Sequence, residues 1–210
     1  MKRVYFVRHA ESEANVSRIH GGPHHPLSKK GEQQAAFIAE RCAKLPLQAL
    51  FASDAVRAQQ TAGAISKRIG LPVHTVHDFH EINMPSHLME QQFDTPEAIE
   101  AESNLIENMR PGHRHSDEEN FDDMILRAGR VLEMLSNLPE EHVGVVTHGL
   151  FLRCIVGRAI FGPDISPREV LALWRGLRTE NTGLTVVDYR PDTPKALWRV
   201  YTWNDHAHLG

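Results

Sequence analysis

Apolar residues recur along the chain in two periods, and the two periods alternate. Buried strands are predicted at six short runs rich in β-branched and aromatic residues: 3–8, 50–52, 73–76, 143–146, 185–189 and 198–203. Helices are predicted where apolar positions recur at helical spacing: 28–45, 55–69, 121–138, from 149 onward and, more weakly, 96–109. Strands alternating with helices predict an α/β fold, a three-layer α/β/α sandwich with a mostly parallel central sheet.

The length and spacing of these elements predict a single domain over residues 1–210. The polar stretch of about 81–120 interrupts the alternation. We expect it to form a helical and loop insertion over the sheet edge. The late strand, Ala196 to Trp203, could be a sheet edge used for homodimerisation.

Composition narrows the class of protein. Apolar residues make up 41% of the chain, charged residues 24%, and the net charge is -4. This balance argues against a nucleic-acid partner, because nucleic-acid binders are usually basic. The most apolar stretch, 143–162, is interrupted by one histidine and two arginines, so we expect no membrane association and a cytoplasmic protein. Cys42 and Cys154 lie in helical patterns and are expected to be buried thiols, not disulfide or zinc ligands.

Three predicted strands end in residues that suit phosphate. Arg8 and His9 end the first strand, Arg57 follows the second, and His148 follows the fourth. Because the carboxyl ends of parallel strands converge on one crevice, we expect these four side chains to meet. Arginine offers planar pairs of donors that match phosphate, and the helix that opens after His148 adds backbone N–H groups and a favourable dipole.

These strand ends also carry a family resemblance. The segments VRHAESEAN, SDAVRAQQTA and VVTHG, in this order, resemble the histidine phosphatase superfamily, also called phosphoglycerate-mutase-like, branch 1. HHPLSKKGEQQA, ENTGLTVVDY and NDHAHL resemble further segments of that family. The similarity runs from Arg3 to about Leu209 and thins between Glu81 and Asn120.

The resemblance implies a metal-independent, cofactor-free phosphatase that hydrolyses small-molecule phosphate monoesters. His9 would form the phosphohistidine, and Glu81 stands where the family places its proton donor. The implied phosphate-binding residues are Arg8, Asn15, Arg57 and His148, of which His148 is also catalytic. No metal site is expected, because the fourteen histidines form no HExxH helix and no Cys/His finger. The insertion would cap the pocket.

The sequence departs from the family pattern at several positions. Ala10 stands where glycine is common, His24 where aspartate is common, and Asp54, which could still cap the following helix, where proline is common. No glycine follows Glu81, in Ile82-Asn83-Met84-Pro85-Ser86-His87. The alternative proton donors are therefore kept: Glu11, Asp78 and Glu90.

Other residues have two readings. Ser53 and Thr61 are expected to support the phosphate loop, whereas Asn181 either backs the site or only makes a turn. Five cations of the insertion either bind a second anionic group or form a solvated loop: His87, Arg110, His113, Arg114 and His115.

Two other functions use the same residues. A phosphoglycerate mutase would keep the phosphohistidine long enough to pass it to a sugar acid, but the chain is short and lacks the glycine-bearing segment after Glu81. A non-catalytic member of the family would bind phospho-ligands without turnover. The presence of all four residues at the strand ends, Arg8, His9, Arg57 and His148, argues against this function.

Overall fold

A six-stranded sheet forms the centre of the computed structural model, which describes residues 1–107, 110–114, 116–193 and 197–210, without the side chains of 101, 102 and 104–107. The strands are β1 (Lys2–Arg8), β2 (Ala49–Ala52), β3 (Val73–Thr75), β4 (His142–Thr147), β5 (Leu184–Tyr189) and β6 (Trp198–Asp205). Their order is β3-β2-β4-β1-β5-β6. The first four run parallel, β5 is antiparallel to β1, and β6 is antiparallel to β5. The predicted mostly parallel sheet is confirmed.

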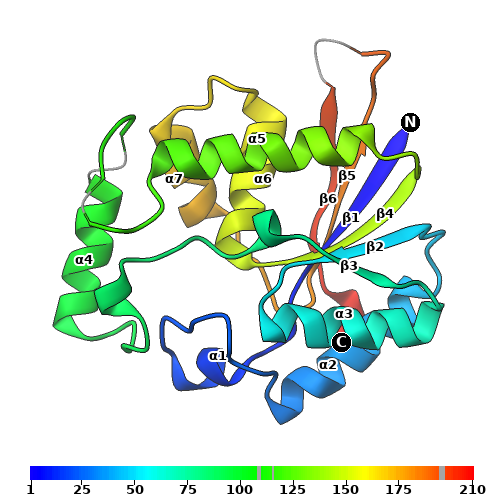
Figure 1. Ribbon diagram of the computed structural model, residues 1–210, viewed down its shortest axis with the longest axis horizontal. Coiled ribbons are helices and arrows are strands. Elements are labelled where there is room, and N and C mark those ends of the chain that lie inside the picture. The colour runs from blue at the N-terminus through cyan, green and yellow to red at the C-terminus, as the bar shows by residue number, and fades with distance from the viewer. Residues whose placement is uncertain (108–109, 115, 194–196) are drawn as a thin grey trace.

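Helices cover both faces of this sheet (Figure 1). α2 (Lys29–Cys42) and α3 (Val56–Ile69) lie on one face, and α5 (Phe121–Asn137) and α6 (Gly149–Phe161) lie on the other. Side chains of β1 alternate between the two cores: Val4 and Phe6 pack toward α5 and α6, whereas Tyr5 and Val7 pack toward α2 and α3. Burial on both faces explains the continuous apolar run of this strand, and the predicted three-layer arrangement is confirmed.

Capping residues set the helix ends. The Ser28 hydroxyl accepts from the Gly31 amide at 3.0 Å, so α2 begins where expected. Gly70, at φ +76°, ends α3 in the left-handed conformation. Two helices were not predicted: α1 (Glu13–Ser17) and α7 (Pro167–Gly176). The second carries a readable signal, a Ser166–Glu169 capping box with Pro167 at the first helical position.

The insertion lies beside the layers at one end of the molecule (Figure 1). It contains a 3₁₀ turn, η2 (Ser86–Leu88), and α4 (Pro96–Glu107); the predicted end of that helix at Met109 falls outside the described residues. Its backbone pairs with the loop after β1, since the His20 amide donates to the Gln91 carbonyl at 2.9 Å. A short 3₁₀ turn, η1 (His77–Phe79), leads into it, and another, η3 (Ala207–Leu209), ends the chain.

β6 forms one edge of the sheet, as expected for the late strand, although Ala196 lies outside the described residues. Its use in dimerisation stays a prediction. Both cysteines are free and buried, as expected. Among the described helices, none combines the length and the apolar character needed to cross a membrane.

Candidate active site

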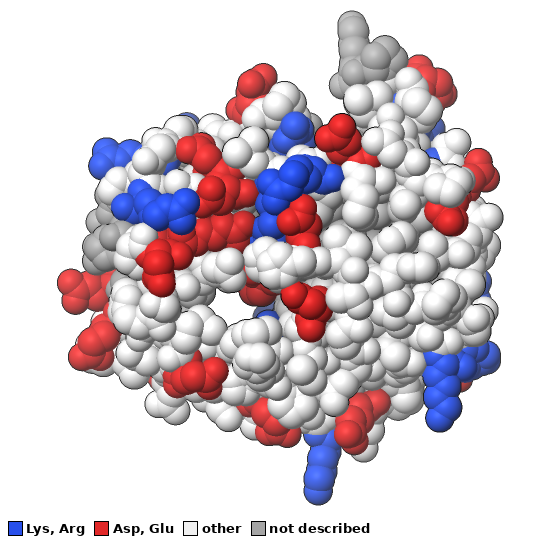
Figure 2. All heavy atoms as spheres, viewed as in Figure 1, with Lys and Arg blue, Asp and Glu red and all other residues white. Residues whose placement is uncertain are grey.

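Three parallel strands end side by side and deliver the candidate residues. The register pairs Arg8 of β1 with Thr147 of β4, and the His9 amide donates to the Thr147 carbonyl at 2.9 Å. The Ser53 amide, just after β2, donates to the Val146 carbonyl at 3.0 Å. Figure 2 shows a hollow between the segment that carries α4 and the body of the molecule, on the side toward which these strands end. The expected crevice at the carboxyl ends of the strands is therefore present.

His9 is buried, and its two ring nitrogens have different partners. Nδ1 lies 2.7 Å from the Ala10 carbonyl, which can only accept, so Nδ1 carries the proton. Nε2 accepts from Nε of Arg57 at 3.2 Å. Burial, with the charges of Arg57 and Arg8, holds the pKa of His9 well below its usual value. His9 is therefore neutral near neutral pH, with the Nε2 lone pair toward the arginine, which is the form that can attack phosphorus.

Arg57 joins the two histidines of the site. Besides His9, its guanidinium contacts Nδ1 of His148 at 3.3 Å and donates to the Gly22 carbonyl at 2.7 Å. The two imidazole rings have their centroids 5.1 Å apart. The Thr61 hydroxyl donates to the Arg57 carbonyl at 2.8 Å and accepts from the Ala10 amide at 3.0 Å, so Thr61 supports the loop as predicted.

His148 is fully buried and precedes α6 as its N-cap. Its Nε2 lies 2.9 Å from the Ser53 hydroxyl, which can donate or accept. Burial, then His9 and Arg57, hold the pKa of His148 well below its usual value. A guanidinium nitrogen can only donate, so Nδ1 of His148 accepts from Arg57, and the ring proton lies on Nε2, which donates to the Ser53 hydroxyl.

One buried nitrogen of Arg8 has no hydrogen-bond partner among the described protein atoms. One terminal nitrogen donates to the Thr179 carbonyl, whereas the buried Nε has no hydrogen-bond partner. A Cβ on Gly149 would lie 3.3 Å from that nitrogen and 2.9 Å from the Thr179 hydroxyl, so glycine leaves the room that Arg8 needs. An orphaned, buried, charged donor of this kind suits an anionic ligand.

Glu81 lies at the N-terminus of α6, where its carboxylate accepts from the amides of Leu150 at 3.1 Å and Phe151 at 2.9 Å. Burial lowers the pKa of Arg8 and of Arg57, and the nearby charge of Glu81 opposes that effect. Two amides at the start of this helix therefore bind Glu81, and the use of the remaining ones for a phosphate stays a prediction.

The alternative proton donors bind other partners. The Asp78 carboxylate pairs with Arg130 at 3.0 Å. Glu11 accepts from the Ser28 hydroxyl at 2.8 Å and from a lysine. Glu90 lies 2.8 Å from the His25 ring, which lowers the pKa of that carboxyl. Of the four candidate carboxylates, Glu81 alone binds the start of α6.

Two asparagines back the nucleophile. The side-chain amide of Asn181 donates to the His9 carbonyl at 3.0 Å and to the Asn15 side-chain oxygen at 3.3 Å. That oxygen of Asn15 also accepts from the Ser12 amide in the capping box of α1. Asn181 therefore supports the site rather than only making a turn. The side-chain oxygen of Asn15 is already bonded, so its side-chain nitrogen is the group that can donate to a phosphate oxygen.

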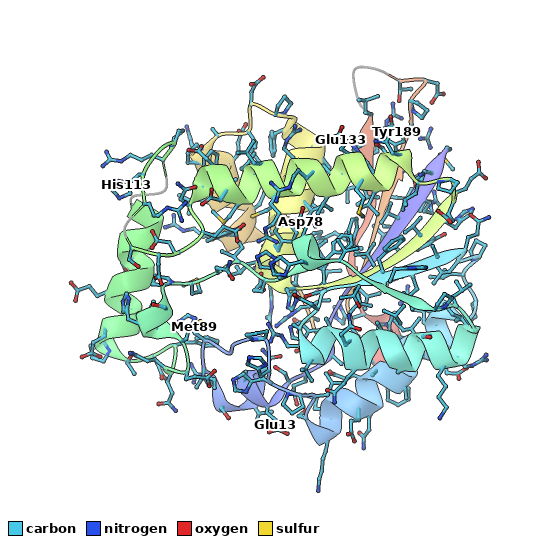
Figure 3. All side chains as sticks on the ribbon, in the orientation of Figure 1. Glu13, Asp78, Met89, His113, Glu133 and Tyr189 are labelled. Atoms are coloured by element: carbon cyan, nitrogen blue, oxygen red, sulfur yellow. The ribbon has the colours of Figure 1, made fainter. Side chains whose placement is uncertain are left out.

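One expectation for the surrounding loops needs correction. Asp54 does not cap α3; its carboxylate lies 2.6 Å from Nδ1 of His77. Arg114 of the insertion donates to the Glu118 carbonyl and to Asp123. Figure 3 shows His113 at the outer end of the insertion, away from the strand ends.

The second-anion role of the remaining cations of the insertion stays a prediction. His87 and Arg110 are exposed, and His115 lies outside the described residues. Within the described part of the chain, no three histidine, cysteine, aspartate or glutamate side chains gather as metal ligands would.

Sequence reasoning missed the pair Glu119–Arg127, which flanks the site behind Glu81. Its Nε–Oε1 and Nη2–Oε2 distances are both 2.6 Å. Both residues are buried, and the available signal was Arg127, three residues after Met124 and four before Val131, on the apolar face of the predicted helix 121–138.

A family model described as the histidine phosphatase superfamily (branch 1) matches residues 4–206. Two relatives named "Probable phosphoglycerate mutase GpmB" match the whole chain and 95% of their own length: the Photorhabdus laumondii protein is 33% identical over 217 residues, and the Enterobacter sp. (strain 638) protein is 32% identical over 214.

Two solved structures have the same fold. Bacillus stearothermophilus YhfR matches with a TM-score of 0.80 at 23% identity, over 100% of both chains. A mycobacterial glucosyl-3-phosphoglycerate phosphatase in complex with VO3 matches with a TM-score of 0.79 at 23% identity, over 97% of this chain and 99% of that one. Together with the family model and the relatives, they place this chain in branch 1 of the histidine phosphatase superfamily.

Proposed function

We propose that this protein hydrolyses phosphate monoesters of small molecules through a phosphohistidine on His9. The observation that carries the proposal is a buried, neutral imidazole whose Nε2 faces Arg57, with Arg8 and His148 beside it. Arg8 and Arg57 supply fixed positive charge for the transferring phosphoryl group.

The reaction has two steps. In the first, the Nε2 lone pair of His9 forms a bond to phosphorus while the bond to the leaving oxygen breaks. That oxygen keeps the electron pair and takes a proton from the Glu81 carboxyl group. In the second step, Glu81 takes a proton from water, the water oxygen attacks phosphorus, and the P–N bond breaks. Inorganic phosphate leaves, and His9 is neutral again.

The segment 81–120 is proposed to cap the pocket, because it begins at the proton donor and pairs with the loop after β1. A small substrate fits a site bounded in this way. The names of two structural neighbours, glucosyl-3-phosphoglycerate phosphatase and alpha-ribazole phosphatase, support hydrolysis at the level of the fold.

A second candidate is mutase-type phosphoryl transfer. It is favoured by the names of the relatives that are 31–33% identical to this chain. Both activities need the same phosphohistidine and differ in whether water or a second hydroxyl accepts the phosphoryl group.

The test is a panel of phosphate monoesters assayed for phosphate release, with wild type and His9→Asn, with and without EDTA. A coupled assay on 3-phosphoglycerate runs beside it. We expect phosphate release from the wild type only, unaffected by EDTA, and slower mutase turnover. Equal release by His9→Asn overturns His9 as nucleophile, and mutase turnover above every hydrolysis rate favours the second candidate.

A further inference from the structure

Side chains bind three consecutive carbonyl oxygens just before Glu81. A terminal nitrogen of Arg127 donates to the carbonyls of Asp78 at 2.9 Å and His80 at 2.8 Å. The Thr147 hydroxyl donates to the carbonyl between them, that of Phe79, at 2.8 Å. The path of the chain into Glu81 is therefore set by α5 and by the end of β4.

Glu119, the ion-pair partner of Arg127, binds the backbone that follows Glu81. The Glu119 amide donates to the Asn83 carbonyl at 2.9 Å, and its carboxylate accepts from the Asn83 amide at 3.3 Å. The same carboxylate binds Arg127 with both oxygens. One ion pair thus fixes the backbone before and after Glu81.

The same arginine also packs against the group that binds the Glu81 carboxylate. Its guanidinium carbon lies 3.5 Å from the ring centroid of Phe151. The Phe151 amide is one of the two α6 donors to Glu81. Arg127 therefore contacts both the segment that carries Glu81 and the residue that receives its carboxylate.

A buried ion pair brings little net stability, because removing two charges from water costs about as much as their attraction returns. The side chains of Arg127 and Glu119 are 3% and 8% exposed. Arg130, one turn along α5, makes the exposed counterpart with Asp78. The buried pair differs from it in binding main-chain atoms on both sides of Glu81.

We propose that Arg127, held by Glu119, is a positioning residue that sets the Glu81 carboxyl group for proton transfer to the leaving oxygen. This inference rests on the proposed function, in which Glu81 is the acid. A displaced acid matters most for poor leaving groups, because a good leaving group departs without a proton.

The test compares kcat/KM for an alkyl phosphate and for p-nitrophenyl phosphate in Arg127→Lys, Thr147→Val and the control Arg130→Ala. We expect Arg127→Lys to lose about 10²-fold on the alkyl ester and much less on the aryl ester. Thr147→Val should also lose more kcat/KM on the alkyl ester than on the aryl ester, by a smaller factor. Arg130→Ala should keep the wild-type ratio of the two kcat/KM values. Circular dichroism and thermal melting check that each variant is folded.

Equal losses on both esters, or no loss on either, overturn the positioning role. If Arg127→Lys fails to fold, Thr147→Val decides in the same way: a loss confined to the alkyl ester supports the role, and an unchanged ratio overturns it. Failure of the proposed function is distinguishable, because it appears as hydrolysis by His9→Asn whatever stands at Arg127.

Discussion

The Nε of Arg57 lies 3.2 Å from Nε2 of His9, the nitrogen proposed to attack phosphorus, and the same guanidinium reaches Nδ1 of His148 at 3.3 Å. One buried arginine thus faces both histidines. Its charge disfavours protonation of each ring and marks where a phosphate oxygen would bind.

Arg57→Lys should lower kcat/KM by about 10²–10³-fold, because an ammonium group is a point charge and cannot reach both histidines and the Gly22 carbonyl together. Arg68→Lys is the matched control, since Arg68 lies on the same helix in an exposed pair with Glu40. Steady-state kinetics on one phosphate monoester measures both. A loss under tenfold in Arg57→Lys would show that the guanidinium fork is not used.

Ser53→Ala should leave the ring proton on Nε2 of His148 without an acceptor. Without the hydroxyl, Nε2 of this buried ring loses its partner, at a cost of about 1–3 kcal/mol in the free energy of unfolding. Nitrogen chemical shifts of the imidazole report the lost hydrogen bond at Nε2, and denaturant unfolding reports the cost. Ser66→Ala removes a hydroxyl that donates to the Leu71 carbonyl and is the control. Unchanged imidazole shifts in Ser53→Ala would rule out this role for Ser53.

Lowered histidine pKa values predict how stability depends on pH. The unfolded chain takes up protons below about pH 6.5, whereas folded His9 and His148 stay neutral to lower pH. Each therefore removes stability as pH falls below that value, by about 1.4 kcal/mol per pH unit at most, and neither affects stability above it.

The measurement is denaturant unfolding from pH 7.5 to 5 in phosphate-free buffer. His9→Asn should have a shallower loss of stability at acid pH than the wild type. His24→Asn, which replaces an exposed histidine on the loop after β1, should keep the wild-type slope. Parallel curves for wild type and His9→Asn would mean that folded His9 titrates normally.

Glu81→Gln should lower kcat/KM for alkyl phosphates by about 10²–10⁴-fold and for p-nitrophenyl phosphate by less, because only the alkoxide needs a proton to leave. Asp78→Asn tests the nearest alternative carboxylate, which pairs with Arg130. If the selective loss follows Asp78 instead, the acid has been assigned to the wrong residue.

The core of the site could be predicted because its residues directly follow predicted strands. Arg8, His9 and His148 end strands whose apolar runs are local, and parallel pairing brings those ends together. The approach of these three residues therefore follows from the parallel pairing of the strands that carry them.

The surroundings of Glu81 could not be predicted in this way. Glu81 binds amides 69 and 70 residues further along the chain, and Arg127 binds carbonyls 47 and 49 residues before it. Backbone donors and acceptors are present at almost every residue, so they leave no mark in the sequence. The same holds for Asp54, whose carboxylate contacts a histidine 23 residues away and does not cap the helix as expected.

Trapping the intermediate tests the phosphohistidine on His9 most directly. Wild type and His9→Asn are mixed with a phosphate monoester, quenched in alkali, which preserves phosphohistidine, and examined by peptide mass spectrometry. We expect one added phosphoryl group on the peptide that contains His9, labile to acid, and no such adduct in His9→Asn. Turnover by the wild type with no adduct at any quench time, or an adduct on another residue, would contradict it.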